Sequence, residues 1–284
     1  MTLQALYDQA VTAHRQGLLA EAERLYRQLL RAAPASFGPL HMLGVLRAQQ
    51  GDPEEALALI GRALRQQPRA ADALFNRGRI LKEAGRLDEA LASYDGALAA
   101  RPDYAAARLA RAEARNLKGI ALQQAERHGE AVAVYDGALA DAPDYGDAIN
   151  NRAVTLWAMG RFEEALAGFN RALAVRPDYV EAHFNRGNVL RDMLRLDETM
   201  TSFDRATRSI PVSRRPIATK DSALCCAVIS GRAFHFTNGA RGCPRRSRRA
   251  VIRGLCGPAR KMCAARRCLP MSNKDWATPS CSGV

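Results

Sequence analysis

A proline returns every 34 residues through most of this 284-residue chain, and this period constrains the fold more than any other feature. The prolines are Pro34, Pro68, Pro102, Pro143, Pro177 and Pro211, with one interval of 41 residues between the third and the fourth. A fixed period of this length is typical of stacked supersecondary units. Such a unit cannot bury its apolar face alone, so the copies must share one continuous core.

Other residue types recur at fixed distances before each proline. A small residue stands twenty-four positions before it, at Ala10, Gly44, Gly78, Gly119, Ala153 and Gly187. A large apolar residue stands eight positions before it, at Tyr26, Ile60, Tyr94, Tyr135, Phe169 and Phe203. A residue that is usually Gly stands seventeen positions before it, at Gly17, Gly51, Gly85, Glu126, Gly160 and Leu194. The pattern predicts two closely packed helices per unit, with a left-handed residue ending the first and the proline ending the second.

The pattern resembles the tetratricopeptide repeat (TPR) family over residues 3–211. It consists of two small residues, an aromatic residue, Ala and Pro in fixed order at this period. The resemblance implies an all-α fold, a right-handed α-solenoid of about six helix-turn-helix repeats. It also implies a concave groove, lined by the first helix of each pair, that binds peptides or protein segments. The expected repeats are 3–36, 37–70, 71–104, 105–145, 146–179 and 180–213. Leu194 and Thr199 depart from the family pattern in the last copy, which makes its turn the weakest match.

The fourth repeat contains seven extra residues, between Pro102 and Gly119. This stretch is rich in Ala, Arg and Leu, which favour helix. Seven residues are about two helical turns, so the insertion nearly preserves the apolar face. We expect a first helix that is longer at its N-terminal end and protrudes from the edge of the superhelix. The alternative is a disordered loop.

The chain changes character after Pro211. Residues 1–211 contain 27 basic and 27 acidic residues, whereas 212–284 contain 15 basic and 2 acidic ones. The net charge of +13 and all seven cysteines therefore belong to the last 73 residues. Residues 217–230 have apolar residues at roughly helical spacing and are a candidate capping helix. Residues 231–284 are expected to be a disordered basic tail.

Three interpretations of the tail stay open. A zinc or disulfide module is disfavoured, because only the pair Cys263 and Cys268 has ligand-like spacing and the expected compartment is reducing. A nucleic-acid or anionic-surface arm would use the arginines between Arg241 and Arg253, but no recognised binding fold is present. The third interpretation, which we favour, is an out-of-frame extension without evolved structure.

Motifs for catalysis, cofactors and metal binding are not found, so we expect a non-enzyme without a cofactor. Paired acids such as Asp88 and Glu89 recur at one repeat position and are interpreted as solvated helix starts. The N-terminus has no secretory pattern and no apolar run reaches about 18 residues, so a cytoplasmic protein without a transmembrane segment is expected.

The groove is the expected functional site. Asn76, Asn151 and Asn185 fall at one position of three first helices, and a carboxamide can bond a peptide main chain without reading its sequence. The neighbours expected on that face are Asp72, Phe75, Arg79, Lys82, Asn150, Trp157, Phe184, Asn188 and Arg191. The alternative is that these asparagines support packing between repeats. TPR arrays of the type that clamps the C-terminal carboxylate of chaperones have their first groove Lys at one repeat column. That column contains no Lys here, which disfavours chaperone-tail binding. Its residues are His41, Phe75, Asn116, Asn150 and Phe184.

The Asn column is similar to that of the TPR arrays in O-linked N-acetylglucosamine transferases and their bacterial relatives, although Leu117 interrupts it. Two functions are therefore considered. The first is a scaffold or adaptor that binds a protein or peptide segment in the groove. The second is the substrate-recruiting part of a truncated or frameshifted glycosyltransferase.

Overall fold

The computed structural model describes residues 2–209. Within that range it contains twelve α-helices and no strand, which confirms the all-α solenoid of helix pairs. The predictions for 217–230 and 231–284 lie outside the described residues. The helices are α1 Leu3–Arg15, α2 Leu19–Ala32, α3 Phe37–Gln49, α4 Pro53–Gln66, α5 Ala71–Glu83, α6 Leu87–Ala100, α7 Ala105–Gln124, α8 His128–Asp141, α9 Gly146–Ala158, α10 Phe162–Val175, α11 Val180–Asp192 and α12 Leu196–Ser209.

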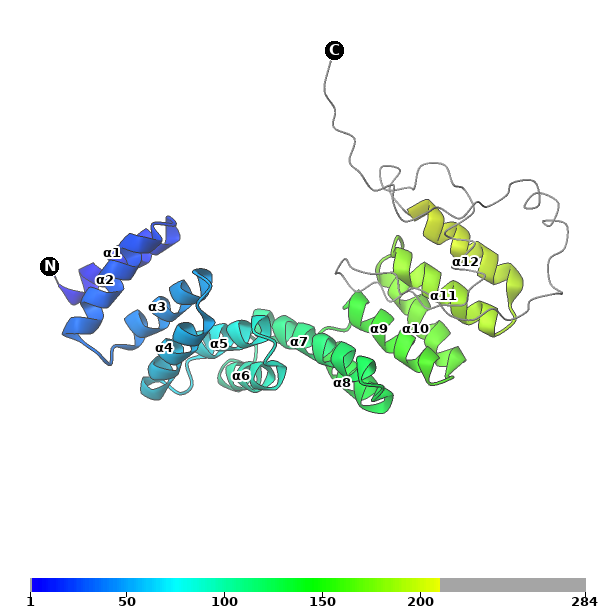
Figure 1. Cartoon of the computed structure of the whole chain (residues 1–284), viewed down its shortest axis with the longest axis horizontal. Coiled ribbons are helices and arrows are strands. Elements are labelled where there is room, and N and C mark those ends of the chain that lie inside the picture. Colours follow the sequence, from blue (N-terminus) through cyan, green and yellow to red (C-terminus); the bar gives the residue numbers. More distant parts are fainter. Residues whose placement is uncertain (1, 210–284) are drawn as a thin grey trace, which may run out of the picture. The chain divides into compact units, whose positions relative to one another are not determined.

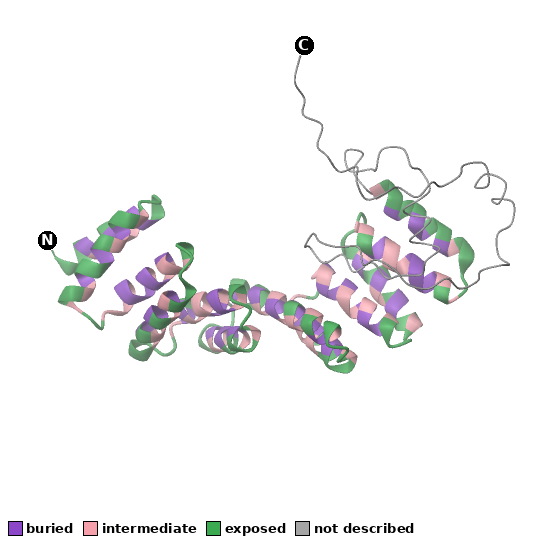
Figure 2. Cartoon of the chain, viewed as in Figure 1, coloured by how far each residue is buried: buried purple, intermediate pink, exposed green. Residues whose placement is uncertain are grey.

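The helices pack in chain order, as Figure 1 shows. Each odd-numbered helix packs on the even-numbered helix that follows it, and each even-numbered helix packs on the next odd-numbered one. The buried residues form a stripe along the facing sides of the helices, with exposed residues on the outside (Figure 2). Since these contacts lie within a pair or join adjacent pairs, stability depends on each pair and on its junctions.

The small-residue column sets how closely the two helices of a pair approach. A Cβ atom at Gly78 would lie 2.6 Å from the Tyr94 ring, and one at Gly119 would lie 2.5 Å from the Tyr135 ring. Both tyrosine residues are fully buried. In the fifth pair the second helix also has a small residue at this contact, because a Cβ atom at Gly168 would lie 2.7 Å from Ala153 Cβ. At Gly78 and Gly119 the column therefore marks a direct contact between the backbone of one helix and a ring of the next.

The turn inside each pair keeps one backbone form, whichever residue occupies it. Gly17, Gly51, Gly85 and Gly160 have φ between 75° and 84°, and Glu126 and Leu194 have φ of 60° and 62°. In the two turns without Gly, Arg127 N donates to Leu122 O at 2.9 Å and Arg195 N donates to Leu190 O at 2.8 Å. These are the bonds of a helix end closed by a left-handed residue. Two non-glycine residues thus hold a conformation that is unfavourable for them.

The paired acids belong to helix starts, as predicted. Asp52 Oδ1 accepts from Glu55 N at 3.1 Å, and Pro53 is the first residue of α4. In later pairs an arginine before the helix bonds the acid three residues on, as Arg86 does to Glu89 at 2.7 Å. Arg161 does the same to Glu164 at 2.6 Å. These carboxylates are solvent-exposed and act on the positive end of their own helix.

The seven extra residues of the fourth repeat are continuous helix, since α7 has 20 residues and the other first helices have 13. The helical prediction is confirmed, but the prediction that these turns protrude is wrong in part. Ala107 and Ala110 are buried, and Ala110 lies in one cluster with Leu81 and Tyr94. Only the opposite side of the extension, including Leu109 at 50% exposure, faces solvent.

Candidate functional site

The first helices α1, α3, α5, α7, α9 and α11 form one face of the array. Each of them contacts the first helix of the next pair. Within residues 2–209, contact of that extent is absent between successive second helices. The first helices therefore lie closer together than the second ones, on the inner side of the stack. We call this surface the first-helix face, and it contains the predicted groove residues.

The predicted asparagines hydrogen-bond to the preceding repeat. Asn76 Nδ2 lies 2.9 Å from His41 Nε2, so the imidazole nitrogen accepts from the amide. Asn151 Nδ2 donates to Asn116 Oδ1 at 3.0 Å, and Asn185 Nδ2 donates to Asn150 Oδ1 at 3.3 Å. All three partners lie 35 residues earlier in the chain, on the preceding first helix. The packing role that was the alternative is thus present, and it uses one amide donor of each side chain.

The interruption at Leu117 follows from the same register. The position that would pair with Leu117 is occupied by Phe75, and the position that would pair with Met42 is occupied by Tyr7. At this column, each Asn has a polar residue at its partner position on the preceding first helix. Each apolar residue, Leu117 or Met42, has an aromatic residue there. Because an unpaired buried amide is unfavourable, the two positions must change together.

Burial lowers the pKa of His41, and the Asp72 carboxylate opposes this.

Asp72 links the start of the third repeat to its end and is not a free groove carboxylate. Its two oxygens accept from Arg101 at 3.1 and 3.0 Å, and the hydrogen bond from Arg101 is the main cause of its lowered pKa. The Arg101 guanidinium also lies 4.6 Å from the centre of the Tyr104 ring. Asp147 repeats the arrangement, accepting from Arg176 at 3.2 Å and from the Tyr179 hydroxyl at 3.0 Å.

The predicted aromatic and basic residues are mostly engaged within the array. The Phe75 ring is 5.1 Å from that of Tyr104, and the Phe184 ring is 5.5 Å from that of Phe203. Lys82 Nζ bonds Glu113 at 2.5 Å, and Arg191 forms an ion pair with Asp192 at 3.2 Å. Arg79 is half-buried on α5.

Two further predicted residues are buried. Asn150 is 5% exposed and Asn188 is 3% exposed, so their amides are not open to a ligand on this face. The Nδ2 atom of Asn188 has no hydrogen-bond partner within the described part of the chain.

Trp157 lines a hollow of about 550 Å³ between two successive repeats. We call it the Trp157 hollow. Five of its residues come from the first helices: Gln123, Gln124, Val154, Trp157 and Ala158. The other two, Glu126 and His128, come from the turn between α7 and α8 and from the start of α8. Sequence reasoning found only Trp157, although Gln123 and Trp157 occupy one repeat column and could have been found together.

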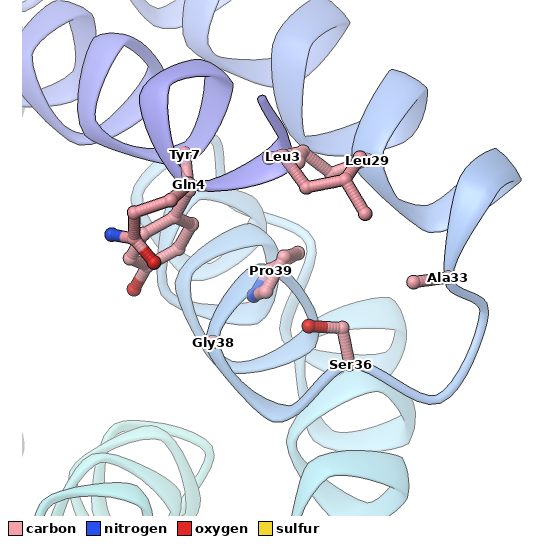
Figure 3. Close-up of a pocket in the computed structure, with 8 residues that line it drawn as sticks. All are labelled: Leu3, Gln4, Tyr7, Leu29, Ala33, Ser36, Gly38 and Pro39. Carbon is pink, nitrogen blue, oxygen red and sulfur yellow. The ribbon is translucent and has the colours of Figure 1, made fainter. Parts of the chain in front are cut away.

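A second, smaller hollow of about 240 Å³ lies at the junction of the first two repeats. Figure 3 shows the Tyr7 side chain of α1 close to Gln4 and reaching toward the start of α3, where Gly38 stands. A Cβ atom at Gly38 would lie 3.0 Å from the Tyr7 ring, so the glycine makes room for it. Burial raises the pKa of Tyr7.

No helix within residues 2–209 is long and apolar enough to cross a membrane. The same range contains no group of three His, Cys, Asp or Glu side chains placed to hold a metal ion.

Comparison with known proteins agrees with the repeat pattern. The tetratricopeptide repeat model matches residues 2–37 and 41–105, and a TPR repeat model matches residues 156–193. A 52-residue stretch, 18% of this chain, is 48% identical to cellulose synthase 2 operon protein C of Komagataeibacter xylinus and spans 4% of that protein. The expected similarity to O-GlcNAc transferase-like arrays is not shown.

One solved structure of a tetratricopeptide repeat protein shares the fold. A tetratricopeptide repeat protein from Parabacteroides merdae is similar with a TM-score of 0.50 and 21% identity, over 73% of this chain and 79% of that one. YrrB, a TPR protein with an unusual peptide-binding site, is similar with a TM-score of 0.48 and 19% identity, over 66% of this chain and 93% of that one. By their repeat columns, their helix pairs and the models that match them, residues 2–37, 41–105 and 156–193 of this chain are tetratricopeptide repeats.

Proposed function

We propose that this chain is a non-catalytic scaffold that binds an extended segment of another protein on its first-helix face. The Trp157 hollow carries the proposal, because it combines an indole, two apolar side chains and two amides from successive first helices. Aromatic residues that are partly exposed in a hollow are common anchors of protein interfaces. The glycosyltransferase alternative has no observation in its favour.

The asparagines that join the repeats contribute beside the hollow. A carboxamide has two donors and an acceptor oxygen, and the contact between repeats uses one donor of Asn151 and of Asn185. Both residues are half-buried on the same face. The second amide donor of each side chain can bond a main-chain carbonyl of a segment that lies along α9 and α11, which supports affinity without strict sequence preference.

The test is peptide selection with the full-length chain from a random display library. Binders are then measured against two variants that each add one long basic side chain at an exposed alanine. Ala158→Arg alters the Trp157 hollow, whereas Ala174→Arg alters α10, a second helix. We expect binding at least about tenfold weaker, or 1.4 kcal/mol, for the first variant and unchanged for the second. Equal affinities for both variants, or a library that yields no specific binder, would contradict the proposal.

A further inference from the structure

The Trp157 hollow contains one formally charged side chain, the Glu126 carboxylate. Its other polar groups are the Gln123 and Gln124 amides and the His128 ring, and no Lys or Arg lines it. Gln123 Oε1 accepts from the Tyr135 hydroxyl at 3.3 Å. The hollow therefore has a negative charge at its edge and no cation in its lining to balance it. This charge favours a cationic ligand group over a neutral or anionic one.

One wall of the hollow suits a long side chain that ends in a cation. Val154, Trp157 and Ala158 form an apolar surface, on which the methylene stem of a basic residue can lie. The Trp157 Nε1 atom donates to Asp192 Oδ2 at 2.9 Å, which fixes the orientation of the indole. An indole face held in one orientation also attracts a guanidinium by a cation–π interaction.

Glu126 occupies a position where a non-glycine residue is unfavourable. Four of the six turns have glycine here, and Glu126 has a φ of 60°. A left-handed backbone is unfavourable for a non-glycine residue. The carboxylate is exposed, and among the described residues it has no cationic partner. Its two oxygens are therefore available at the edge of the hollow.

We propose that the Trp157 hollow binds an arginine side chain of the partner segment. The stem lies against Val154, Trp157 and Ala158, and the guanidinium pairs with the Glu126 carboxylate and stacks on the indole. Arginine fits better than lysine, because a planar guanidinium can do both at once. The inference rests on the proposed function and adds the chemistry of one anchor residue.

The probe is a set of three pentapeptides of the form acetyl-Ala-Ala-X-Ala-Ala-amide. X is arginine, its uncharged analogue citrulline, or the apolar norleucine. The protein is the full chain carrying Trp276→Phe, so that Trp157 is the only indole. Titration is followed by indole fluorescence. We expect saturable binding of the arginine peptide, with affinity at least about tenfold above that of the other two.

Variants separate the carboxylate from the turn that carries it. Glu126→Gln and Glu126→Gly should both reduce the preference for arginine to less than about threefold, and the second variant also relieves the backbone. Leu194→Gly is the matched control, because it relieves the same conformation in the last repeat and should leave the preference unchanged. Glu163→Gln removes an exposed charge from α10 and should also leave it unchanged.

Each remaining outcome overturns the inference. Equal binding of arginine and norleucine peptides would make the hollow an apolar anchor, while the scaffold function would stand. A preference that survives Glu126→Gln, or the absence of any Trp157 response, would remove arginine as the ligand of this hollow. The display selection with Ala158→Arg and Ala174→Arg tests the scaffold function independently of these results.

Discussion

In the third and fifth repeats, the same side-chain interactions join the end of the repeat to the start of its first helix. The fourth repeat uses different ones. The sequence Arg-Pro-Asp-Tyr closes the third repeat at 101–104 and the fifth at 176–179. In each, the arginine and the tyrosine hold an aspartate at the start of the repeat's first helix. These aspartates, Asp72 and Asp147, have side chains 58% and 43% exposed. Solvent-exposed pairs of this kind contribute little each, and their regular geometry sets spacing.

The fourth repeat has Ala142 in place of that arginine, and its charges are buried instead. Asp141 accepts from Arg111 at 2.8 Å and from Arg115 at 2.6 Å, and its side chain is 6% exposed. Arg111 also bonds Asp95 of α6 at 2.6 Å. Arg111 belongs to the extra turns of α7. In the fourth repeat, ion pairs therefore bind the two extra turns of α7 to α6 and α8. The regular repeats, whose first helices lack these turns, do not need such ion pairs.

The largest expected effect separates these two kinds of link. Asp141→Asn leaves two arginine side chains, 20% and 26% exposed, without their carboxylate, and should destabilise the chain by about 2–3 kcal/mol. Asp147→Asn acts on an exposed pair and should cost less than about 1 kcal/mol. Urea unfolding followed by helical circular dichroism measures both. Similar shifts of the midpoint for the two variants would remove the distinction.

The turns offer a second contrast, with opposite signs. Glu126→Gly in the fourth repeat should stabilise the chain by about 1 kcal/mol, because glycine adopts the left-handed conformation without strain. Gly85→Ala in the third repeat should destabilise it by about the same amount. Nothing lies within 4 Å of a Cβ atom at Gly85, so crowding does not contribute. Thermal unfolding of both variants tests this, and effects of the same sign would contradict it.

The smallest effect concerns two buried tyrosine residues. Tyr135 donates to Gln123, whereas the Tyr94 hydroxyl is buried without a hydrogen-bond partner in the described residues. Tyr94→Phe should therefore stabilise the chain by up to about 1 kcal/mol, and Tyr135→Phe should cost about 0.5–1 kcal/mol. Unfolding midpoints in urea decide the signs. A loss of stability in Tyr94→Phe would show that its hydroxyl has a partner.

Much of the fold could be predicted from the columns, because each column performs one mechanical task. Every copy of the unit needs a close contact such as that of Gly78 with Tyr94 and a left-handed turn residue such as Gly17. The extra residues of the fourth repeat have no second copy to compare with. Their helical state followed from propensity, but the position of Arg111 between Asp95 and Asp141 depends on two other helices. Local periodicity carries no information on such a contact.

The candidate site was less accessible to sequence reasoning. A repeat column shows that Asn151 lies on the first helix, but it does not show that Asn116 is close enough to bond it. Asp72 is a different case, because an Arg-Pro-Asp-Tyr motif follows both Asp72 and Asp147 at the same distance. That recurrence was a signal for a link between helices. The Trp157 hollow depends on the side chains of two repeats together, which one repeat does not reveal.

The bonds between successive first helices also fix the order in which the copies can stand. Joining the third repeat directly to the fifth would place Phe75 opposite Asn151, and the amide would lose its partner at Asn116. The copies therefore resemble one another in shape but are not interchangeable. A duplication or deletion of repeats keeps every Asn opposite a polar partner only when it begins and ends at two polar junctions or at two apolar junctions. The polar and apolar junctions thus record which recombination events the chain can accept.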